Sequence, residues 1–166
     1  MLLKRILFIA VLFCSLACIF VSCSQDKYSS SLSCFEISSA LAREISVPGG
    51  EFSQYSSDDI KFFFPDSSNY TDACISYSTD STDVAEIGVL RSANEESAKA
   101  LYEEVKNHIK NLQEQKREFL RNYSPNELQK LNSAQARRFG EFVVYTVSDP
   151  KDQENLFAKA EELFTK

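Results

Sequence analysis

The chain has no tryptophan, one histidine and four glycines among its 166 residues, and these scarcities exclude several classes of enzyme. One histidine cannot form the paired-histidine zinc motif of metalloproteases, and the G-x-S-x-G turn of serine hydrolases is absent. Gly49-Gly50 is followed by no phosphate-loop lysine, and no C-x-x-C pair supports a redox or zinc motif. The residue types therefore predict no enzyme, no bound metal and no cofactor.

Positive charge is also scarce, since 18 lysines and arginines stand against 24 aspartates and glutamates. If Lys4 and Arg5 are removed with a leader peptide, 16 basic residues remain and the net charge becomes −8. A domain that binds nucleic acid needs a basic patch, and docking on anionic lipid needs a basic cluster. The composition therefore predicts an acidic, solvated surface and argues against nucleic acid as a partner.

No apolar run reaches the roughly 20 residues that a membrane-spanning helix needs. The run over residues 6–21 follows Lys4-Arg5 and ends at Ser22-Cys23, which is the order of parts in a secretory signal. It resembles a bacterial lipoprotein signal, which implies cleavage after residue 22 and lipidation of Cys23. Two acyl chains on that sulfur are enough for stable anchoring in the lipid bilayer. Cys18 is the alternative acceptor, and an uncleaved signal anchor is the other interpretation.

Residues 23–32 are rich in serine, and they predict a flexible tether between the lipid and a single domain over residues 33–166. Such a protein would be held at the cell membrane, facing outside the cytoplasm, where disulfides can form. Cys34 and Cys74 could close a loop that adds about 4 kcal/mol of stability. The alternative is two buried free thiols.

The spacing of apolar residues predicts an α+β domain. Apolar residues three and four apart indicate helices, and alternating ones indicate strands. Two hairpins would give a four-stranded antiparallel sheet packed on amphipathic helices, a two-layer sandwich. The long helix is expected to begin at a capping box and to bury Phe119. Helices are expected over residues 33–46 and 92–122, from Pro125 and after Asp149-Pro150, and strands over 73–78, 86–90, 134–138 and 142–147.

Residues 51–72 are compatible with two structures. Ser57-Asp58-Asp59 could cap one helical turn through Ile60–Phe64, ended by Pro65, or Phe62–Phe64 could form a short strand. Three consecutive aromatic residues cannot all face one core, so one of them is expected at the surface. An exposed aromatic patch marks a partner site, which makes Phe62 and Phe63 candidate partner contacts.

Three segments carry a resemblance to a known family. They are Ala85–Leu90 before a long charged helix, Asn122–Glu127, and Tyr145–Asp149 before the last helix. From about Ser33 to Lys166 the chain resembles a family of small bacterial lipoproteins catalogued as domain of unknown function 4358, although Ala136-Arg137-Arg138 departs from the more aliphatic strand of that family. The resemblance implies an extracytoplasmic lipoprotein and no particular activity.

Few side chains suggest chemistry. His108 lies at the edge of the apolar stripe of the long helix, one turn after Glu104, and a structural role is expected because a general base needs an orienting partner and a reacting group. The loop Asp80–Asp83 lacks the spacing of a calcium loop, so a plain turn is expected. Arg137 and Arg138 either protect an edge strand from aggregation or bind an acidic ligand.

These features favour a membrane-anchored, non-enzymatic binding or interaction module at the cell envelope. Its partner would be an envelope protein or a wall polymer. A cell-envelope hydrolase is the first alternative, and it would need two carboxyl groups about 5–10 Å apart in a cleft. A structural lipoprotein that associates with its own copies is the second alternative.

Overall fold

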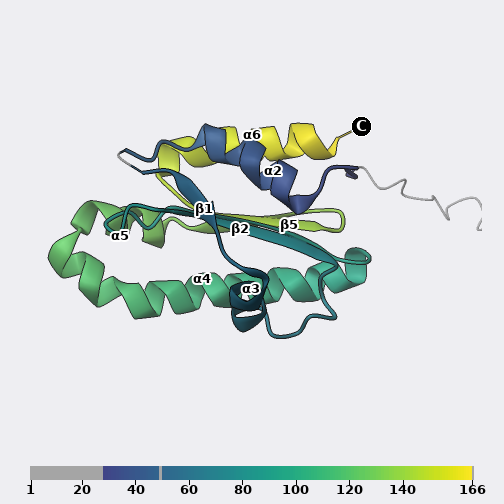
Figure 1. The fold of residues 1–166 in the computed structure, drawn as a ribbon, viewed down its shortest axis with the longest axis horizontal. Coiled ribbons are helices and arrows are strands. Elements are labelled where there is room, and N and C mark those ends of the chain that lie inside the picture. The colour runs from purple at the N-terminus through teal and green to yellow at the C-terminus, as the bar shows by residue number, and fades with distance from the viewer. Residues whose placement is uncertain (1–27, 49, 166) are drawn as a thin grey trace, which may run out of the picture.

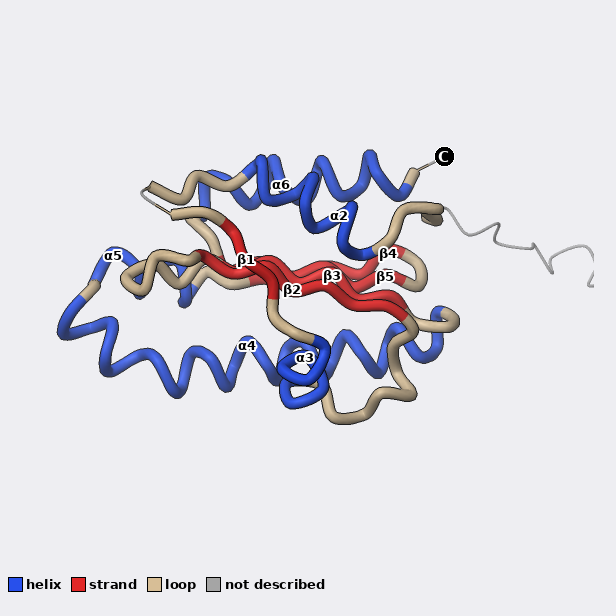
Figure 2. The backbone as a smooth tube through the Cα atoms, viewed as in Figure 1, coloured by secondary structure: helices blue, strands red, loops and turns tan. Residues whose placement is uncertain are grey.

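The computed structural model describes residues 28–48 and 50–165, so that Cys23 and Cys18 lie outside the described residues. Helices and strands are interspersed along the described chain (Figures 1 and 2). In chain order the elements are α2 (Cys34–Leu41), a 3-10 turn over Ala42–Glu44, β1 (Phe52–Gln54), α3 (Ser57–Phe63), β2 (Asp72–Ser78), β3 (Glu86–Arg91), α4 (Glu95–Tyr123), α5 (Pro125–Asn132), β4 (Gln135–Phe139), β5 (Phe142–Val147) and α6 (Pro150–Phe164).

The described strands form one antiparallel sheet in the order β1-β2-β3-β5-β4 (Figure 2). Both predicted hairpins, β2–β3 and β4–β5, are present, and β3 pairs with β5 at the centre. The sheet has five strands where four were predicted. The additional strand, β1, pairs with β2 through only three residues, and Phe52 is its one apolar side chain. A segment this short carries no alternating pattern from which a strand could be predicted.

Helices cover both faces of the sheet, with α2 and α6 on one face and α3 and α4 on the other (Figure 1). The structure thus has three layers, and the prediction of two layers was wrong. The pattern of β5 explains the third layer. Val144 faces the core beneath α2 and α6, whereas Val143 and Tyr145 face the core beneath α3 and α4. A central strand that is apolar on both faces needs a helix on each side to exclude water.

The helices begin at polar capping residues. Asp149 caps α6, as the sequence predicts. The predicted start of α4 at residue 92 was wrong. The helix is capped by Asn94, whose side chain accepts a hydrogen bond from the N–H of Ser97. Ser92 begins the helix predicted over residues 92–122, but its hydroxyl donates instead to the carbonyl oxygen of Asn69 and is buried.

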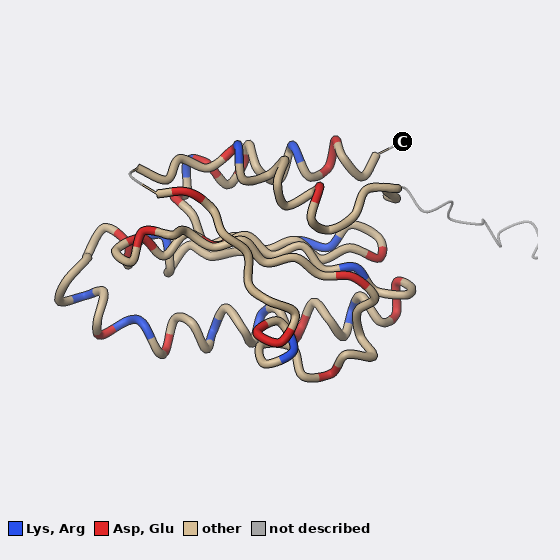
Figure 3. The backbone as a smooth tube through the Cα atoms, in the orientation of Figure 1, with Lys and Arg blue, Asp and Glu red and all other residues tan. Residues whose placement is uncertain are grey.

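Helix α4 extends beyond the sheet, and acidic and basic residues alternate along it (Figure 3). Phe119, which was predicted to be buried, is 58% exposed, and Leu120 is buried in its place. The buried face changes because the last turns of α4 pack on α5, where Leu120 meets Leu131, and no longer on the sheet. None of the helices in the described part of the chain is long and apolar enough to cross a membrane.

The segment that leads into α2 is docked on the domain. Tyr28 pairs with Thr165 in an isolated β-bridge, and its ring meets that of Phe139 edge to face at 5.4 Å. The N–H of Ser29 donates to the carbonyl oxygen of Phe164 over 2.7 Å. Residues 28–32, which were predicted to belong to the flexible tether, therefore pack with the folded domain.

Candidate functional site

A buried polar cluster lies between the sheet and α4. It joins Glu86 of β3, Tyr145 of β5 and His108 of α4, which are 4%, 0% and 7% exposed. The hydroxyl of Tyr145 donates to Oε1 of Glu86 over 2.7 Å, and Nε2 of His108 lies 3.1 Å from the same oxygen. A carboxylate is tolerated in a protein interior only when it is hydrogen bonded, and two donors meet this requirement here.

Gly88 allows Tyr145 to reach the carboxylate. The two residues face each other in the register of β3 and β5, and the tyrosine ring lies directly over the glycine. A Cβ atom at position 88 would overlap the ring, so a larger residue would displace Tyr145 from the sheet. The glycine thereby holds the hydroxyl beside Glu86.

The surroundings of the cluster determine where its protons lie. Burial, and then the negative charge of Glu86, raises the pKa of Tyr145 well above its ordinary value, so the hydroxyl remains a donor at neutral pH. The same two causes raise the pKa of Tyr55 to about 12. Nε2 of His108 and the hydroxyl of Tyr145 therefore meet at one carboxylate oxygen, Oε1 of Glu86.

His108 also lines a pocket of about 240 Å³ between α3 and α4, which we call the α3–α4 pocket. A capping box of Ser56 and Asp59 starts α3, and Ile60 and Phe64 hold the helix through their burial in the core it shares with α4. The residues that line the pocket are Phe62, Phe63, His108, Asn111, Leu112 and Gln115.

The observed α3 is the helical one of the two structures predicted for residues 51–72. Phe63 packs on the ring of His108 at 5.1 Å and on that of Tyr55 at 5.0 Å. Phe62 is 82% exposed, and its ring lies 5.9 Å from that of Phe63. The pocket is therefore aromatic on the α3 side, while α4 contributes two amides, one leucine and the histidine, and none of the lining residues is an acid, lysine or arginine.

Arg137 and Arg138 lie on the edge strand β4, and their side chains are engaged in ion pairs. Arg137 pairs with Glu154 at 3.2 Å, and its guanidinium lies 4.2 Å from the centre of the Phe157 ring. Arg138 lies 3.7 Å from Glu95. Helix α3 contacts β2, and β4 is the third strand beyond β2. The structure therefore does not bring the arginines together with the aromatic residues of α3.

Cys34 and Cys74 are buried free thiols in the core beneath α2. Burial raises the pKa of both thiols, and the charge of Asp72 raises that of Cys34 further. Redox and nucleophilic chemistry needs the thiolate, so both side chains act as small apolar groups. Of the two alternatives for this pair, the structure has the free thiols and not the disulfide.

The Asp80–Asp83 loop is stabilised from within and by a lysine. Oδ1 of Asp80 accepts from the N–H of Thr82 over 2.8 Å, and Asp83 pairs with Lys130 of α5 at 3.0 Å. The ammonium group thus supplies the positive charge beside this loop. In residues 28–48 and 50–165, no group of three or more histidine, cysteine or carboxylate side chains is placed to hold a metal ion.

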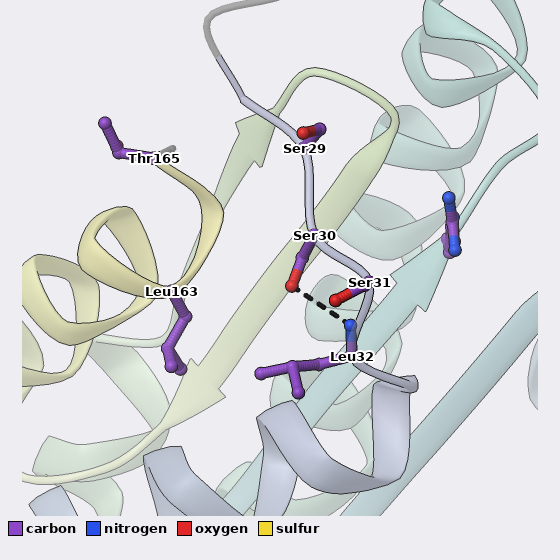
Figure 4. A pocket seen from close by; sticks show the side chains of 7 residues that line it. Ser29, Ser30, Ser31, Leu32, Leu163 and Thr165 are labelled. Carbon is purple, nitrogen blue, oxygen red and sulfur yellow. Dashed lines mark hydrogen bonds between the residues drawn. The ribbon is translucent and has the colours of Figure 1, made fainter.

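A wider hollow of about 490 Å³ lies where the chain enters the domain (Figure 4). Residues 29–32 form one wall, and Leu163 and Thr165 at the end of α6 form another. The N–H of Leu32 donates to Oγ of Ser30 over 3.3 Å, which holds the entering segment in a turn. The hollow thus marks the end of the domain that is nearest in sequence to Cys23.

Sequence reasoning missed Glu86 and the two pocket amides, Asn111 and Gln115. Glu104, one turn before His108, was the acid expected beside the histidine, whereas in the structure the acid within hydrogen-bond distance of Nε2 is Glu86. A signal for Glu86 was present, because this acid begins a strand that is otherwise apolar up to its last residue, Arg91. Glu86 lies on the same face of the strand as Leu90, which packs toward α4. No signal marked the amides, since the exposed positions of a long helix look alike until α3 is placed beside them.

The architecture and the site define a class of small α+β domains, with an antiparallel sheet between two helical layers and an uncharged pocket on one side. Residues 52–148 match the family model described as Domain of unknown function (DUF4358), which is more than half of the chain, so the protein belongs to this family. The match includes the buried cluster and the α3–α4 pocket, while α2 and α6 lie outside it. Comparison with curated proteins and with solved structures gives no match.

Proposed function

We propose that this protein is a lipid-anchored lipoprotein of the cell envelope whose folded domain binds a partner without transforming it. The observation that carries the proposal is the α3–α4 pocket, where Phe62 keeps 82% of its surface exposed beside a hollow with uncharged walls. Burying that ring against a partner would remove apolar surface from water, which is a main source of binding energy.

The buried cluster supports binding more than catalysis. Nε2 of His108 lies within hydrogen-bond distance of Glu86. Catalysis by a general base would also need a reacting group of the substrate beside the histidine. The carboxylate hydrolase considered from the sequence would need two carboxyl groups in a cleft, and the lining of this pocket includes none. In our proposal the cluster holds the wall of the pocket in one geometry, which reduces the entropy lost on binding.

The anchor is the second part of the proposal and rests on the leader sequence. Intact-mass measurement of the membrane-extracted protein should give a chain that starts at Cys23 and carries diacylglyceryl and acyl mass. A Cys23→Ala variant should lose the lipid, while Cys18→Ala should keep it. A chain of full length without added mass would contradict the anchor.

A photo-reactive amino acid at Gln115 tests the binding site in intact cells. Gln115 lines the pocket and is exposed, so the reactive group should capture the partner on illumination. The same group at Lys151, an exposed residue on the opposite face of the sheet, is the matched control. Capture at position 115 should disappear in a Phe62→Ala background. Equal capture at both positions, or capture that does not depend on Phe62, would contradict the assigned site.

A further inference from the structure

The lining of the α3–α4 pocket indicates the chemical class of its ligand. We propose that this pocket binds a neutral sugar unit that carries an N-acetyl group. The inference rests on the proposed function, since it names the ligand of the same binding module.

Charge is the first argument. Charged residues make up 25% of the chain, yet none of the residues that line the pocket is an acid, lysine or arginine. An ionised ligand would have no opposite charge to replace its lost hydration, and this desolvation is costly. The pocket therefore selects an uncharged group.

The aromatic wall is the second argument. Phe62 presents an exposed ring, and the edge-to-face contact at 5.9 Å with Phe63 keeps that ring at the mouth of the pocket. A sugar ring offers one face of C–H groups, which packs on a phenyl ring and loses contact with water there. Its hydroxyl groups point outward at the rim and remain free to bind polar side chains.

The α4 side of the pocket supplies those polar groups. Asn111 and Gln115 are four residues apart, so their side chains lie on one face of the helix. Each amide has both donors and an acceptor, and neither makes a hydrogen bond within the described residues. An acetamido group needs one acceptor, one donor and a dry place for its methyl group. The amides supply the first two, and Leu112 supplies the third.

Size is the last argument. A volume of about 240 Å³ lies below the range of about 300–1,000 Å³ that is typical of pockets for drug-sized ligands. It suits one sugar ring with its substituent. In a longer saccharide, the neighbouring units would lie outside the pocket.

The test uses the full-length, lipid-modified protein in detergent micelles and the tetramer of N-acetylglucosamine as probe. Calorimetric titration measures affinity, and saturation-transfer NMR identifies the protons in contact. Transfer should be strongest at the acetyl methyl group and at one ring face. Phe62→Ala should weaken binding at least tenfold, and Gln115→Ala should weaken it as well. Phe35→Ala removes a 53% exposed ring of α2 on the opposite side of the sheet and should leave affinity unchanged.

Two further probes test the assigned chemistry. The glucose tetramer lacks the acetamido group, and the deacetylated, cationic glucosamine tetramer adds charge, so both should bind at least tenfold more weakly. Equal binding of the three tetramers, no binding of the acetylated one, or binding that survives Phe62→Ala would overturn the inference. Phe62-dependent photo-capture of a protein at position 115 would then still support the binding module, so the two failures can be told apart.

Discussion

Single residues show their effects most clearly at Glu86, whose carboxylate has donors from two other elements. Replacing Tyr145 with phenylalanine keeps the ring over Gly88 but removes one of those donors. A buried acceptor that loses a partner costs about 1–3 kcal/mol, and the free energy of unfolding should fall by that amount. Urea unfolding of the full-length protein in micelles, followed by circular dichroism, measures the change.

Tyr102→Phe is the matched control for that substitution. The hydroxyl of Tyr102 is partly buried and donates to the carbonyl oxygen of Ala136 over 3.4 Å, a long hydrogen bond with no charged partner. Its removal should cost less than half as much as that of the Tyr145 hydroxyl. Equal losses in the two variants would show that Glu86 does not depend on Tyr145.

The elements themselves were largely predictable, because capping and periodicity act over a few residues. The spacing of the apolar residues was enough to predict the strands of both hairpins. Asp149-Pro150 was enough to predict where α6 begins. The third layer was not predicted. The pattern of β5 is apolar on both faces, but a strand pattern does not say which element covers each face. The pocket was predictable only on the α3 side, as an exposed ring among Phe62–Phe64. Its α4 side depends on how two distant elements pack.

The contact of α5 with the β2–β3 loop gives a prediction for an element. Lys130 of α5 lies 3.0 Å from Asp83 and 2.9 Å from Glu127, and its side chain is 14% exposed. In a Lys130→Met variant both carboxylates would lose their cation in a largely dry place. We expect the variant to lose about 2–4 kcal/mol of unfolding free energy at neutral pH, in a urea titration. Lys110→Met, which breaks an exposed pair with Glu114, should cost less than about 0.5 kcal/mol.

The two ion pairs of Lys130 also predict how the stability lost in Lys130→Met depends on pH. Burial alone would lower the pKa of Lys130, but its hydrogen bonds to Glu127 and Asp83 outweigh burial and raise the pKa above 10.5. For a group whose pKa is raised on folding, the stabilisation is complete below the unfolded value and is lost as pH rises through the folded value. The difference between the parent and Lys130→Met should therefore be constant from about pH 6 to about pH 9 and shrink above about pH 10.5. A difference that shrinks already at neutral pH would contradict this assignment.

At the scale of the whole molecule, the described domain has two opposite ends. Tyr28 pairs with Thr165, the residue that follows α6, and the corner between α4 and α5 lies at the opposite end of the domain (Figure 1). If Cys23 carries the lipid, the five residue steps to Tyr28 span at most about 18 Å. The domain would then sit directly on the bilayer, with Thr165 close to the lipid and Asn122 far from it.

Spin labels at these two exposed positions test that orientation. The lipid-modified protein is placed in liposomes that contain a nickel-chelating lipid, and electron paramagnetic resonance measures how strongly nickel relaxes each label. Relaxation should be strong at Thr165→Cys and weak at Asn122→Cys, because paramagnetic relaxation falls steeply with distance. The buried Cys34 and Cys74 should not take up the labelling reagent. In a Cys23→Ala background both labels should lose the effect together. Equal relaxation at the two positions of the anchored protein would mean that Tyr28 does not set the orientation, and that the domain moves freely on a longer tether than its docked start allows.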